Sequence, residues 1–466
     1  MTKVGTSNNP LRVAIVGSGP AGFYAAEHLF KQNKVVVEVD MYDRLPTPHG
    51  LVRSGVAPDH QKIKSVTRVY DKIALNPKFR FYGYVEFGKH INLDDLKKHY
   101  HQIVFATGAQ TDRRMNIPGE DFKGSHAATE FVAWYNGHPD YRDFEFDLSQ
   151  ESAAVVGVGN VAIDVARILC LTEEELRRTD IADYALEALS KSRVRNIYIL
   201  GRRGPAQAAF TNPEIKELGN LADTDVITLP EEVELDEVTR QSLEQNNDHS
   251  TKRKVEILQG YAIKKASEKS RRLHLRFLVS PVELVGDEGG CVKALRLVKN
   301  ELYSAEDGSI RARAMDQFEE LSAGLVFRSI GYHGVPLPGV PFNERWGVAL
   351  NHQGRVIAPD TKKPVPGLYV TGWVKRGPTG VIGTNKTDSG ETVNCMLEDV
   401  VNGAIFDPSH PEAASIENLI RERQPSFVSY SDWLNLDKQE LARGEAEGRP
   451  RVKYTSIAEI LEALRR

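Results

Sequence analysis

Three glycines near the start of the chain stand at positions suited to holding a phosphate group. Gly17, Gly19 and Gly22 lie within the segment 11–27, between an apolar stretch and an alanine-rich one. In this pattern the first glycine permits a tight turn, the second lets a pyrophosphate approach the backbone, and the third lets the following helix pack on the strand. N–H groups at the start of that helix would face phosphate. The alternative is an ordinary glycine-rich turn.

A carboxylate at the end of the next apolar stretch would favour an unphosphorylated ribose over one with a 2′-phosphate. Asp43 closes that stretch, where an acid can accept hydrogen bonds from both ribose hydroxyls and would repel a 2′-phosphate. Glu38 and Asp40 are competing acids, but they fall inside the stretch and we expect them to face solvent. Strand, turn, helix, strand and terminal acid in this order favour a dinucleotide with an unphosphorylated ribose.

A second glycine turn follows in the middle of the chain. Gly157 and Gly159 come after an apolar stretch, and Ala162 stands where the helix must meet the sheet. The next strand ends in Arg202 and Arg203 instead of an acid. Guanidinium groups suit a 2′-phosphate, so the pair favours NADP(H) over NAD(H). The alternative is a pair of arginines in a solvated loop.

Two dinucleotide sites with opposite ribose preferences predict a flavoprotein supplied by NADPH and argue against a dehydrogenase with one cofactor. The segments 101–109 (HQIVFATGA) and 367–373 (GLYVTGW) support this interpretation, because a buried strand that runs into a glycine turn is common where a flavin domain closes. Many enzymes with two nucleotides have an Asp after the last glycine, and Trp373 takes that place here. FAD and NADP(H) are therefore the predicted cofactors.

The order of these motifs predicts an α/β fold with two Rossmann-like dinucleotide-binding domains, in which the NADP domain is inserted into the FAD domain. We expect the first FAD segment over residues 1–110, the NADP domain over 111–329, and the second FAD segment with a C-terminal extension over 330–466. Both crossings are short and carry glycine, as a hinge between domains can. The sequence assigns no role to the extension.

Composition and cysteine spacing exclude several other classes of protein. The 466 residues carry a formal net charge of -4, from 60 basic and 64 acidic side chains, so we expect no nucleic-acid partner. Cys170, Cys291 and Cys395 stand far apart, so we expect neither a disulfide nor a metal site. The polar N-terminal segment and the lack of a long apolar run favour a cytoplasmic protein with no membrane span, which we expect to be a monomer.

Several longer motifs share one resemblance. The segments 50–60 (GLVRSGVAPDH), 159–169 (GNVAIDVARIL), 178–183 (RTDIAD), 201–211 (GRRGPAQAAFT) and 372–385 (GWVKRGPTGVIGTN) resemble the adrenodoxin-reductase-like ferredoxin-NADP reductases, in their bacterial branch. The resemblance covers nearly the whole chain. It implies an FAD enzyme that accepts hydride from NADPH and passes electrons singly to a ferredoxin-type iron–sulfur protein.

The resemblance also implies which residues bind each cofactor. FAD would be held by Ala21, Asp43, Leu51, Val85, Trp373 and the backbone of Gly380, Val381 and Ile382. NADPH would contact Asn160, Val161, Arg202, Arg203, Glu214 and Gly380. The family often has Glu at position 43 and a longer polar residue at position 158; Asp43 still supplies acceptors, whereas Val158 removes one side-chain contact.

Two side chains could handle protons, and one turn could favour negative charge on a bound flavin. His60 is the best candidate for a proton-handling group, with a structural hydrogen bonder as the alternative. Glu217, three residues after Glu214 in a helix expected to follow Asn212, could join His60 in a proton path; the alternative for both acids is compensation of the helix dipole. The turn 377–385 precedes another helical pattern, whose positive end would favour negative charge on the flavin.

One basic stretch could bind a partner, and three other functions remain to be compared with this interpretation. Residues 252–276 carry nine Lys and Arg side chains and could steer an acidic ferredoxin, or could simply be a solvated face. A disulfide reductase is disfavoured because CxxC is absent, and a subunit like that of iron–sulfur glutamate synthase is disfavoured because cluster-binding cysteines are missing. A non-catalytic NADP(H)-sensing protein is the alternative from a different class.

Overall fold

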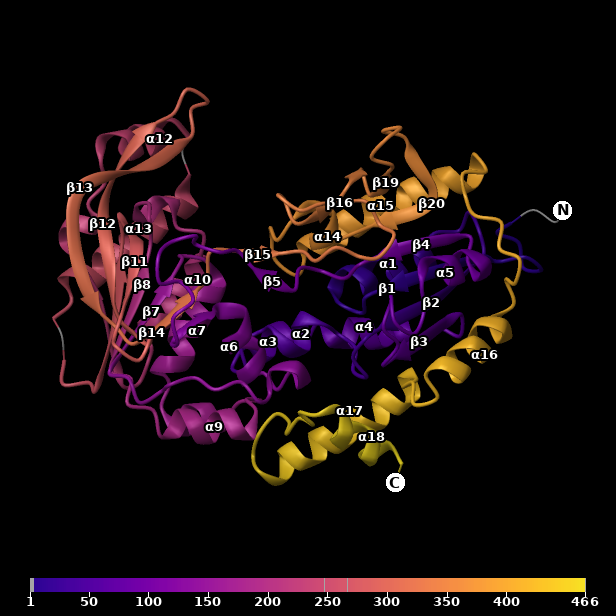
Figure 1. Cartoon of the computed structure of the whole chain (residues 1–466), viewed down its shortest axis with the longest axis horizontal. Coiled ribbons are helices and arrows are strands. Elements are labelled where there is room, and N and C mark those ends of the chain that lie inside the picture. Colours follow the sequence, from indigo (N-terminus) through magenta and orange to yellow (C-terminus); the bar gives the residue numbers. More distant parts are fainter. Residues whose placement is uncertain (1–3, 247, 266, 466) are drawn as a thin grey trace.

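The computed structural model describes residues 4–246, 248–265 and 267–465. Figure 1 shows two lobes joined near the middle of the molecule, with the C-terminal helices running along one side. The outermost residues of the predicted segments, 1–3 and 466, lie outside the described residues. Strand order confirms the predicted fold class, because segments from both ends of the chain share one sheet and the middle of the chain forms another.

The first lobe is built on a sheet to which both ends of the chain contribute. Its strands, in spatial order, are β18 (Asn351–His352), β19 (Arg355–Ile357), β20 (Pro364–Val370), β4 (Gln102–Phe105), β1 (Leu11–Val16), β2 (Val37–Asp43) and β3 (Phe79–Gly83). From β20 to β3 the neighbours are parallel, whereas β18 and β19 form an antiparallel edge. Because β20 pairs with β4, the chain returns to this sheet after the insertion.

Helices cover this sheet and position its glycine turn. They are α1 (Pro20–Lys31), α2 (Leu51–Ser54), α3 (Gln61–Lys64), α4 (Thr67–Ala74), α5 (Leu93–His99), α14 (Trp373–Arg376) and α15 (Thr384–Val401). Every residue of β1 is buried, as expected for a parallel strand with both faces covered. Helix α15 packs against α1 and β20, so the returning segment completes the first dinucleotide unit.

The expectation that Glu38 and Asp40 face solvent is wrong for Asp40. Its carboxylate is buried and accepts hydrogen bonds from Arg12 at 2.8 Å, Arg80 at 2.6 Å and Tyr100 at 2.6 Å. Glu38, one third exposed, binds Arg12 at 2.6 Å. The register causes this burial, because β1 and β3 flank β2 and place an arginine beside each acid. A buried carboxylate is stable only with such partners.

The second lobe contains a fully parallel sheet. Its strands, in spatial order, are β6 (Ser125–Ala127), β14 (Leu325–Arg328), β7 (Ser152–Val156), β8 (Asn196–Leu200), β10 (Arg271–Arg276) and β9 (Thr224–Thr228). Its helices are α6 (Ala128–Tyr135), α7 (Asn160–Cys170), α8 (Glu173–Arg177), α9 (Asp183–Ser190), α10 (Asn212–Leu218), α11 (Pro230–Val233), α12 (Glu237–Asn246) and α13 (His249–Ile263), with 3-10 turns at Pro139–Tyr141 and Pro205–Gln207.

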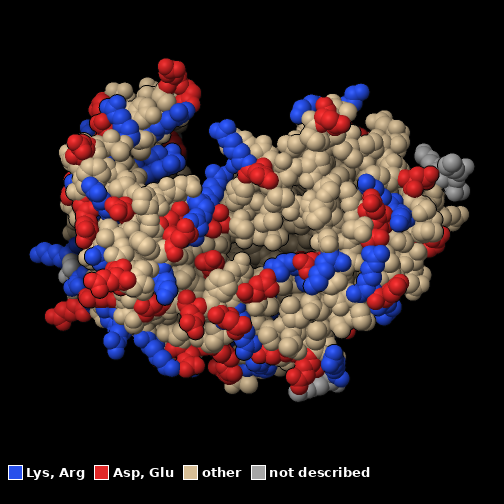
Figure 2. Space-filling view, in the orientation of Figure 1, with Lys and Arg blue, Asp and Glu red and all other residues tan. Residues whose placement is uncertain are grey.

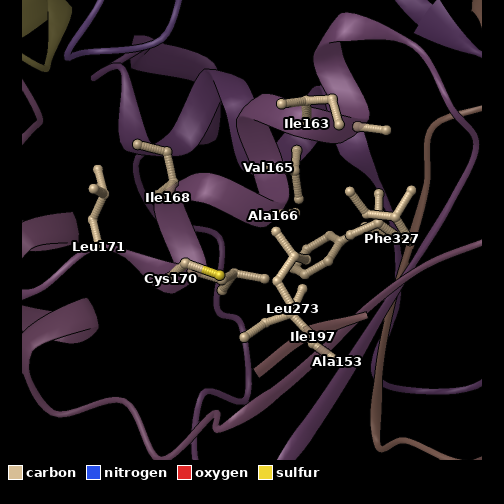
Figure 3. Packing of buried hydrophobic residues seen from close by; sticks show 14 of the residues in the cluster. Ala153, Ile163, Val165, Ala166, Ile168, Cys170, Leu171, Ile197, Leu273 and Phe327 are labelled. Atoms are coloured by element: carbon tan, nitrogen blue, oxygen red, sulfur yellow. The ribbon is translucent and has the colours of Figure 1, made fainter. Parts of the chain in front are cut away.

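The core of this lobe lies between α7 and the sheet. Figure 3 shows Ile163 and Ala166 of α7 above Ile197, Leu273 and Phe327, which come from three strands of the same sheet, β8, β10 and β14. All five side chains are buried. This apolar face fixes α7 on the sheet, so the start of the helix is held beside the second glycine turn.

Smaller elements extend the two lobes and connect them to each other. An antiparallel sheet of β11 (Val279–Gly286), β12 (Val292–Ser304) and β13 (Ile310–Ser322) extends the second lobe, and β16 (Phe342–Asn343) pairs with β17 (Val348–Ala349). The two chain crossings pair with each other as β5 (Thr111–Asp112) and β15 (Tyr332–His333). The C-terminal helices are α16 (Ala413–Arg423), α17 (Tyr430–Ala446) and α18 (Ile457–Leu464); in Figure 1 they run beneath the first lobe toward α9.

Candidate functional site

A cavity of about 400 Å³ opens at the first glycine turn. Gly17 has φ +109°, and a Cβ there would lie 2.5 Å from the Ala106 carbonyl oxygen; a Cβ on Gly22 would lie 2.2 Å from the Gly17 carbonyl oxygen. Gly19 differs, because no atom lies within 4 Å of a Cβ built on it. Gly17 and Gly22 thus allow the turn to form, while Gly19 leaves the backbone open to a ligand.

Asp43 stands at the end of β2 and lines this cavity. One carboxylate oxygen accepts from the Ser18 backbone N–H at 3.0 Å and from its hydroxyl at 2.5 Å, and the other accepts from the Leu45 N–H at 2.9 Å. The acid therefore ties the glycine turn to the strand end. Each carboxylate oxygen has two lone pairs, so the oxygen bound by Leu45 can still accept from a ribose hydroxyl.

Distant segments supply the other walls of the cavity. Ala21, Leu51, Val85 and Trp373 all line it. The Trp373 ring lies 5.1 Å from the Tyr332 ring, and its Nε1 donates to the Thr379 carbonyl at 3.2 Å. The lining thus combines the glycine turn, an acid at a strand end and apolar or aromatic walls, which fits an adenine dinucleotide with a flat ring system.

The residues 380–382 are exposed or half-buried and lie outside the lining of the cavity. Gly380 has φ +78°, a conformation that favours glycine, and a Cβ there would lie 2.5 Å from Thr384 Oγ1. The Thr384 hydroxyl accepts from the Val381 N–H at 3.1 Å. Ile382 follows in the same turn, just before α15 begins at Thr384. The structure therefore places the turn at the positive end of a long helix.

The second glycine turn repeats the backbone geometry of the first. Gly157 has φ +133°, and a Cβ there would lie 2.1 Å from the Ser329 carbonyl oxygen, whereas Gly159 has no neighbour within 4 Å of such an atom. Asn160 begins α7, and its side chain accepts from the Thr211 N–H at 2.9 Å. Val161 follows on the same first turn and is half-buried. This turn also leaves backbone open to a phosphate.

Arg202 and Arg203 follow β8, at the same strand end as the second turn. Neither guanidinium has an ion-pair partner among the described residues. Burial and the neighbouring charge of Arg202 lower the pKa of Arg203. Two adjacent cations without a carboxylate gain from binding a dianion, so the pair fits the 2′-phosphate of NADP(H).

A cluster of ionisable side chains lies where α3, α7 and α10 meet, and we call it the carboxylate cluster. Its members are Asp59, His60, Asp164, Arg167, Glu214 and Glu217. The structure brings His60 and Glu217 together, with His60 Nε2 3.3 Å from Glu217 Oε2. The helix α10 that carries both glutamates begins at Asn212 itself, one residue earlier than expected, with Thr211 as its N-cap.

Arg167 connects these acids. Its guanidinium donates to Glu217 at 2.9 Å, to Asp59 at 2.9 Å and to Asp164 at 3.3 Å, and it is almost fully buried. The sequence analysis did not single out Asp59, Asp164 or Arg167, although each lies in a motif quoted above. A signal was present, because Asp164 and Arg167 are charged residues three apart on an otherwise apolar helix and must share one face.

The acids in this cluster outnumber the cations, and the pKa values of Asp164 and Glu214 are raised. Burial, followed by repulsion from Glu214, Asp59 and Glu217, raises the pKa of Asp164 well above its ordinary value, against the opposing effect of Arg167. Burial also raises the pKa of Glu214. Glu214 Oε2 is buried without a hydrogen-bond partner among the described residues. A bound ligand with an N–H or O–H group would satisfy that oxygen.

The basic stretch 252–276 is not a continuous row of free cations. Arg253 pairs with Glu256, Arg271 with Asp223, and Arg276 with both Glu232 and Glu319. Two more of its cations bind backbone carbonyls: the ammonium of Lys254 donates to Ala208 and that of Lys269 to Leu221. The other cations of the stretch are Lys252, which also has an interaction partner, and Lys264, Lys265 and Arg272. The stretch is divided between α13, β10 and the loop that joins them.

Known proteins share this arrangement. NADPH-ferredoxin reductase FprA of Mycobacterium tuberculosis is 45% identical over 461 residues, covering 97% of this chain and 98% of that protein. Mitochondrial NADPH:adrenodoxin oxidoreductase of Salvelinus fontinalis is 40% identical, with coverage of 97% and 91%. The solved structure of Mycobacterium tuberculosis FprA in complex with NADPH has a TM-score of 0.92 at 43% identity, covering 98% of this chain and 100% of that one.

The fold and the two unlike strand ends define a flavoprotein oxidoreductase that uses two dinucleotides. A model of the pyridine nucleotide-disulphide oxidoreductase family matches residues 11–386. The chain belongs to this family and, within it, to the adrenodoxin-reductase-like ferredoxin-NADP reductases of the bacterial branch. The predicted family, enzyme class and cofactors, FAD and NADP(H), are confirmed. Among the described residues, no helix is both long and apolar enough to cross a membrane.

Proposed function

We propose that this chain is an NADPH-ferredoxin reductase. When bound, FAD would take a hydride from NADPH and release the electrons singly to a ferredoxin-type iron–sulfur protein. The contrast between Asp43 at one strand end and Arg202 with Arg203 at the other carries the proposal, since it gives each glycine turn its own ribose preference. Relatives named for this activity align with nearly the whole chain and support the same reaction.

We assign the binding residues to two groups. The open backbone at Gly19, the strand-end acid and the walls of the larger cavity hold FAD, and the residues 380–382 place the positive end of α15 beside it. The open backbone at Gly159 holds the pyrophosphate of NADPH, with Asn160 and Val161 at the start of α7. Glu214 Oε2 lies 3.8 Å from both His60 Nε2 and an Arg167 nitrogen but accepts no hydrogen bond from the described residues, and it would accept one from the nicotinamide end.

The proton chemistry falls to His60 and Glu217. His60 is nearly buried, with 11% of its side chain exposed, whereas Glu217 is 51% exposed. A proton held at His60 Nε2 can therefore pass to Glu217 Oε2 and reach solvent. Arg167 keeps Glu217 in place through its 2.9 Å hydrogen bond. His60 and Glu217 are thus the proposed catalytic residues.

The domain boundaries form part of the proposal. The strands of the first sheet end at Phe105 and resume at Asn351, while those of the second sheet run from Ser125 to Arg328. This placement supports an FAD domain over residues 1–110 and 330–466 and an NADP domain over 111–329. The paired strands β5 and β15 lie at the two boundaries.

We propose further that the partner is an acidic ferredoxin and that the enzyme works as a monomer in the cytoplasm. Figure 2 shows both Lys and Arg and Asp and Glu side chains bordering the hollow between the lobes; we propose that the Lys and Arg side chains among them attract a negatively charged partner. The free thiols of Cys170, Cys291 and Cys395 support a reducing compartment. Size-exclusion chromatography with light scattering tests the monomer, and a dimer mass contradicts it.

An anaerobic titration of the purified FAD-loaded protein with NADPH tests the function. We expect loss of the oxidised flavin absorbance at one equivalent of NADPH, and then its return when an oxidised ferredoxin is added. The rate of ferredoxin reduction should fall as salt rises, because salt screens charge steering. A protein that binds NADPH but never bleaches its flavin is an NADP(H)-binding protein instead. Bleaching without transfer to any ferredoxin would refute the partner alone.

A further inference from the structure

A second cavity, of about 340 Å³, lies where three parts of the chain meet. The segment from His49 to Asp71 supplies one wall, Asp180 of the second lobe supplies another, and residues 433–453 of the C-terminal extension supply the third. We call this the junction cavity. Its volume falls within the range of about 300 to 1,000 Å³ found for small-molecule sites, and it is separate from the cavity at the first glycine turn.

The lining of the junction cavity carries more cations than carboxylates. Among the described residues, its cations are Arg53, Lys64, Arg68, Arg451 and Lys453, against Asp71, Asp180 and Asp437. Deeper in the same wall, Glu440 binds Arg53 at 2.6 Å and Arg451 at 3.0 Å. Even with this acid included, positive charge exceeds negative charge.

The buried cations share their carboxylates in pairs. The ammonium of Lys64 donates to Asp180 at 2.7 Å, and that of Lys453 lies 3.5 Å from the same aspartate. Both lysines and Asp180 are buried. Burial lowers the pKa of Lys64 and lowers that of Lys453 well below its ordinary value, in spite of the attraction of Asp180. Arg451 also donates to Asp437 at 2.7 Å, so Arg53, Lys64, Arg451 and Lys453 each have a carboxylate partner. The surplus positive charge of the cavity is therefore that of Arg68, and an anion from solution would neutralise it.

Donors at the mouth of the cavity remain available to such an anion. Arg68 is exposed, lines the cavity and has no ion-pair partner among the described residues. Ser65 and Thr67 line the cavity beside it on the same segment, and the Ser65 hydroxyl already donates to the Lys62 carbonyl at 2.6 Å. A guanidinium without an ion-pair partner, beside the Thr67 hydroxyl and in the same lining as two ammonium groups, suits a tetrahedral oxyanion, because two parallel N–H groups of a guanidinium can bind two oxygens of one phosphate.

We propose that the junction cavity is a second anion-binding site, which takes inorganic phosphate or the phosphate group of a small phosphomonoester. The bound anion contacts the first lobe through Arg68 and Lys64 and the C-terminal extension through Arg451 and Lys453. It therefore links segments that are far apart in sequence. The site is independent of the NADPH site, because Arg202 and Arg203 lie outside its lining.

The short helix α2 separates the junction cavity from the larger one. Leu51 and Ser54 line the larger cavity, whereas Val52 and Arg53 line the junction cavity. Opposite faces of one helical turn thus border the two sites. An anion in the junction cavity would hold the back of the helix whose front lines the proposed FAD site.

Isothermal titration calorimetry with inorganic phosphate tests the proposal. The FAD-loaded protein is used at low ionic strength, with Arg202→Ala and Arg203→Ala introduced throughout to remove the strand-end anion site. In this background we expect one saturable phosphate site. Arg68→Gln should weaken phosphate binding about tenfold, because it removes a charged donor. Lys72→Gln, one turn further along α4 and outside the lining, removes the same charge and should change affinity less than about twofold.

A second variant and a second ligand sharpen the result. Lys453→Met should abolish the rise in melting temperature that phosphate produces, even where this variant is itself less stable. Glycerol 3-phosphate distinguishes the two sources: tighter binding than phosphate identifies a phosphomonoester site, and no binding identifies a site for free phosphate. Absence of saturable binding, or equal weakening by Arg68→Gln and Lys72→Gln, would overturn the proposal. Neither the phosphate affinity nor the melting temperature depends on electron transfer.

Discussion

Two ionic regions of this molecule are built with opposite charge imbalances. In the carboxylate cluster, Asp59, Asp164, Glu214 and Glu217 surround Arg167 and His60. At the junction cavity, the cations Arg53, Lys64, Arg68, Arg451 and Lys453 outnumber the acids Asp71, Asp180, Asp437 and Glu440. Both regions are largely buried and both use charge-assisted hydrogen bonds. They differ in the sign of their surplus charge.

The pKa shifts of their acids follow this imbalance. Burial and the surrounding acids raise the pKa of Asp164, whereas Lys453 and Lys64 hold the pKa of Asp180 at about 2, against the opposing effect of burial. Burial acts to raise the pKa of both acids, so the charges around each acid account for the different directions of their net shifts. In the carboxylate cluster, the surplus of acidic side chains favours bound protons beside the proposed redox site. At the junction cavity, the surplus of basic side chains favours a bound anion.

The largest effect should come from removing the acid of the cation-rich region. Asp180→Asn leaves Lys64 and Lys453 buried without a carboxylate, so we expect the free energy of unfolding at pH 7 to fall by about 3 to 5 kcal/mol. Urea denaturation measures it. A carboxyl whose folded pKa is lowered stabilises the fold above its ordinary value of 3.8 and loses that contribution as the pH falls toward 2. The difference in the free energy of unfolding between Asp180→Asn and the wild type should therefore become smaller at acidic pH. A decrease of less than about 1 kcal/mol at pH 7 would contradict the role assigned to Asp180.

The next effect concerns a cation pair that has no acid at all. Arg202→Ala with Arg203→Ala removes the donors to the 2′-phosphate, so we expect the KM for NADPH to rise about 100-fold, which corresponds to about 2.7 kcal/mol. The KM for NADH should change less than about threefold, since NADH lacks that phosphate. Steady-state kinetics with both nucleotides measure the change. Equal rises for NADPH and NADH would refute the phosphate assignment.

A smaller effect should follow from the proton path in the carboxylate cluster. His60→Gln keeps a hydrogen-bonding side chain but cannot carry a proton charge, so we expect the protein to retain FAD and to lose about tenfold in turnover, less than for a strong general acid. Glu217→Gln should give a similar loss, and the double variant should lose little more, because both residues serve one path. Loss of flavin from His60→Gln during purification would instead assign His60 a structural role.

The smallest effect tests the sign of the pKa shift at Asp164. A carboxyl with a raised folded pKa contributes stability below its ordinary value of 3.8 and loses that contribution as the pH rises through its folded pKa. Asp164→Asn removes this ionisation. As the pH rises from 5 to 8, the variant should therefore lose less stability than the wild type. Melting curves across this range measure the difference, and identical pH profiles would mean that Asp164 is already ionised at pH 5.

Local patterns in the sequence predict the two turns and their strand ends well. The conformation of Gly17 and Gly157 is set by a few neighbouring residues, and so is the position of Asp43 or Arg202 at the end of a strand. The fold class follows from the order of these motifs. This success has a simple cause, because a strand–turn–helix unit fixes its ligand-facing atoms within a short stretch of chain.

The ionic regions escaped prediction because their partners are far apart in sequence. Asp40 was expected at the surface, and only the register of β1 and β3 places arginines beside it. Arg167 meets Asp59 across two lobes, and Lys64 meets Asp180 in the same way. Apolar periodicity carries no information about such pairs. The sign of a buried charge can be read from one position, but its partner depends on tertiary structure.

The attachment of the second lobe has a mechanical consequence. It is tethered by the paired crossings β5 and β15 and, at a different edge, by Arg449, whose guanidinium donates to Asp183 at 2.6 Å and also reaches the Ile181 carbonyl. A body held at two separated places cannot turn freely about either of them. The two lobes therefore have little freedom to move as rigid bodies. The distance between the two proposed dinucleotide sites is thus set by the path of the chain before any cofactor binds.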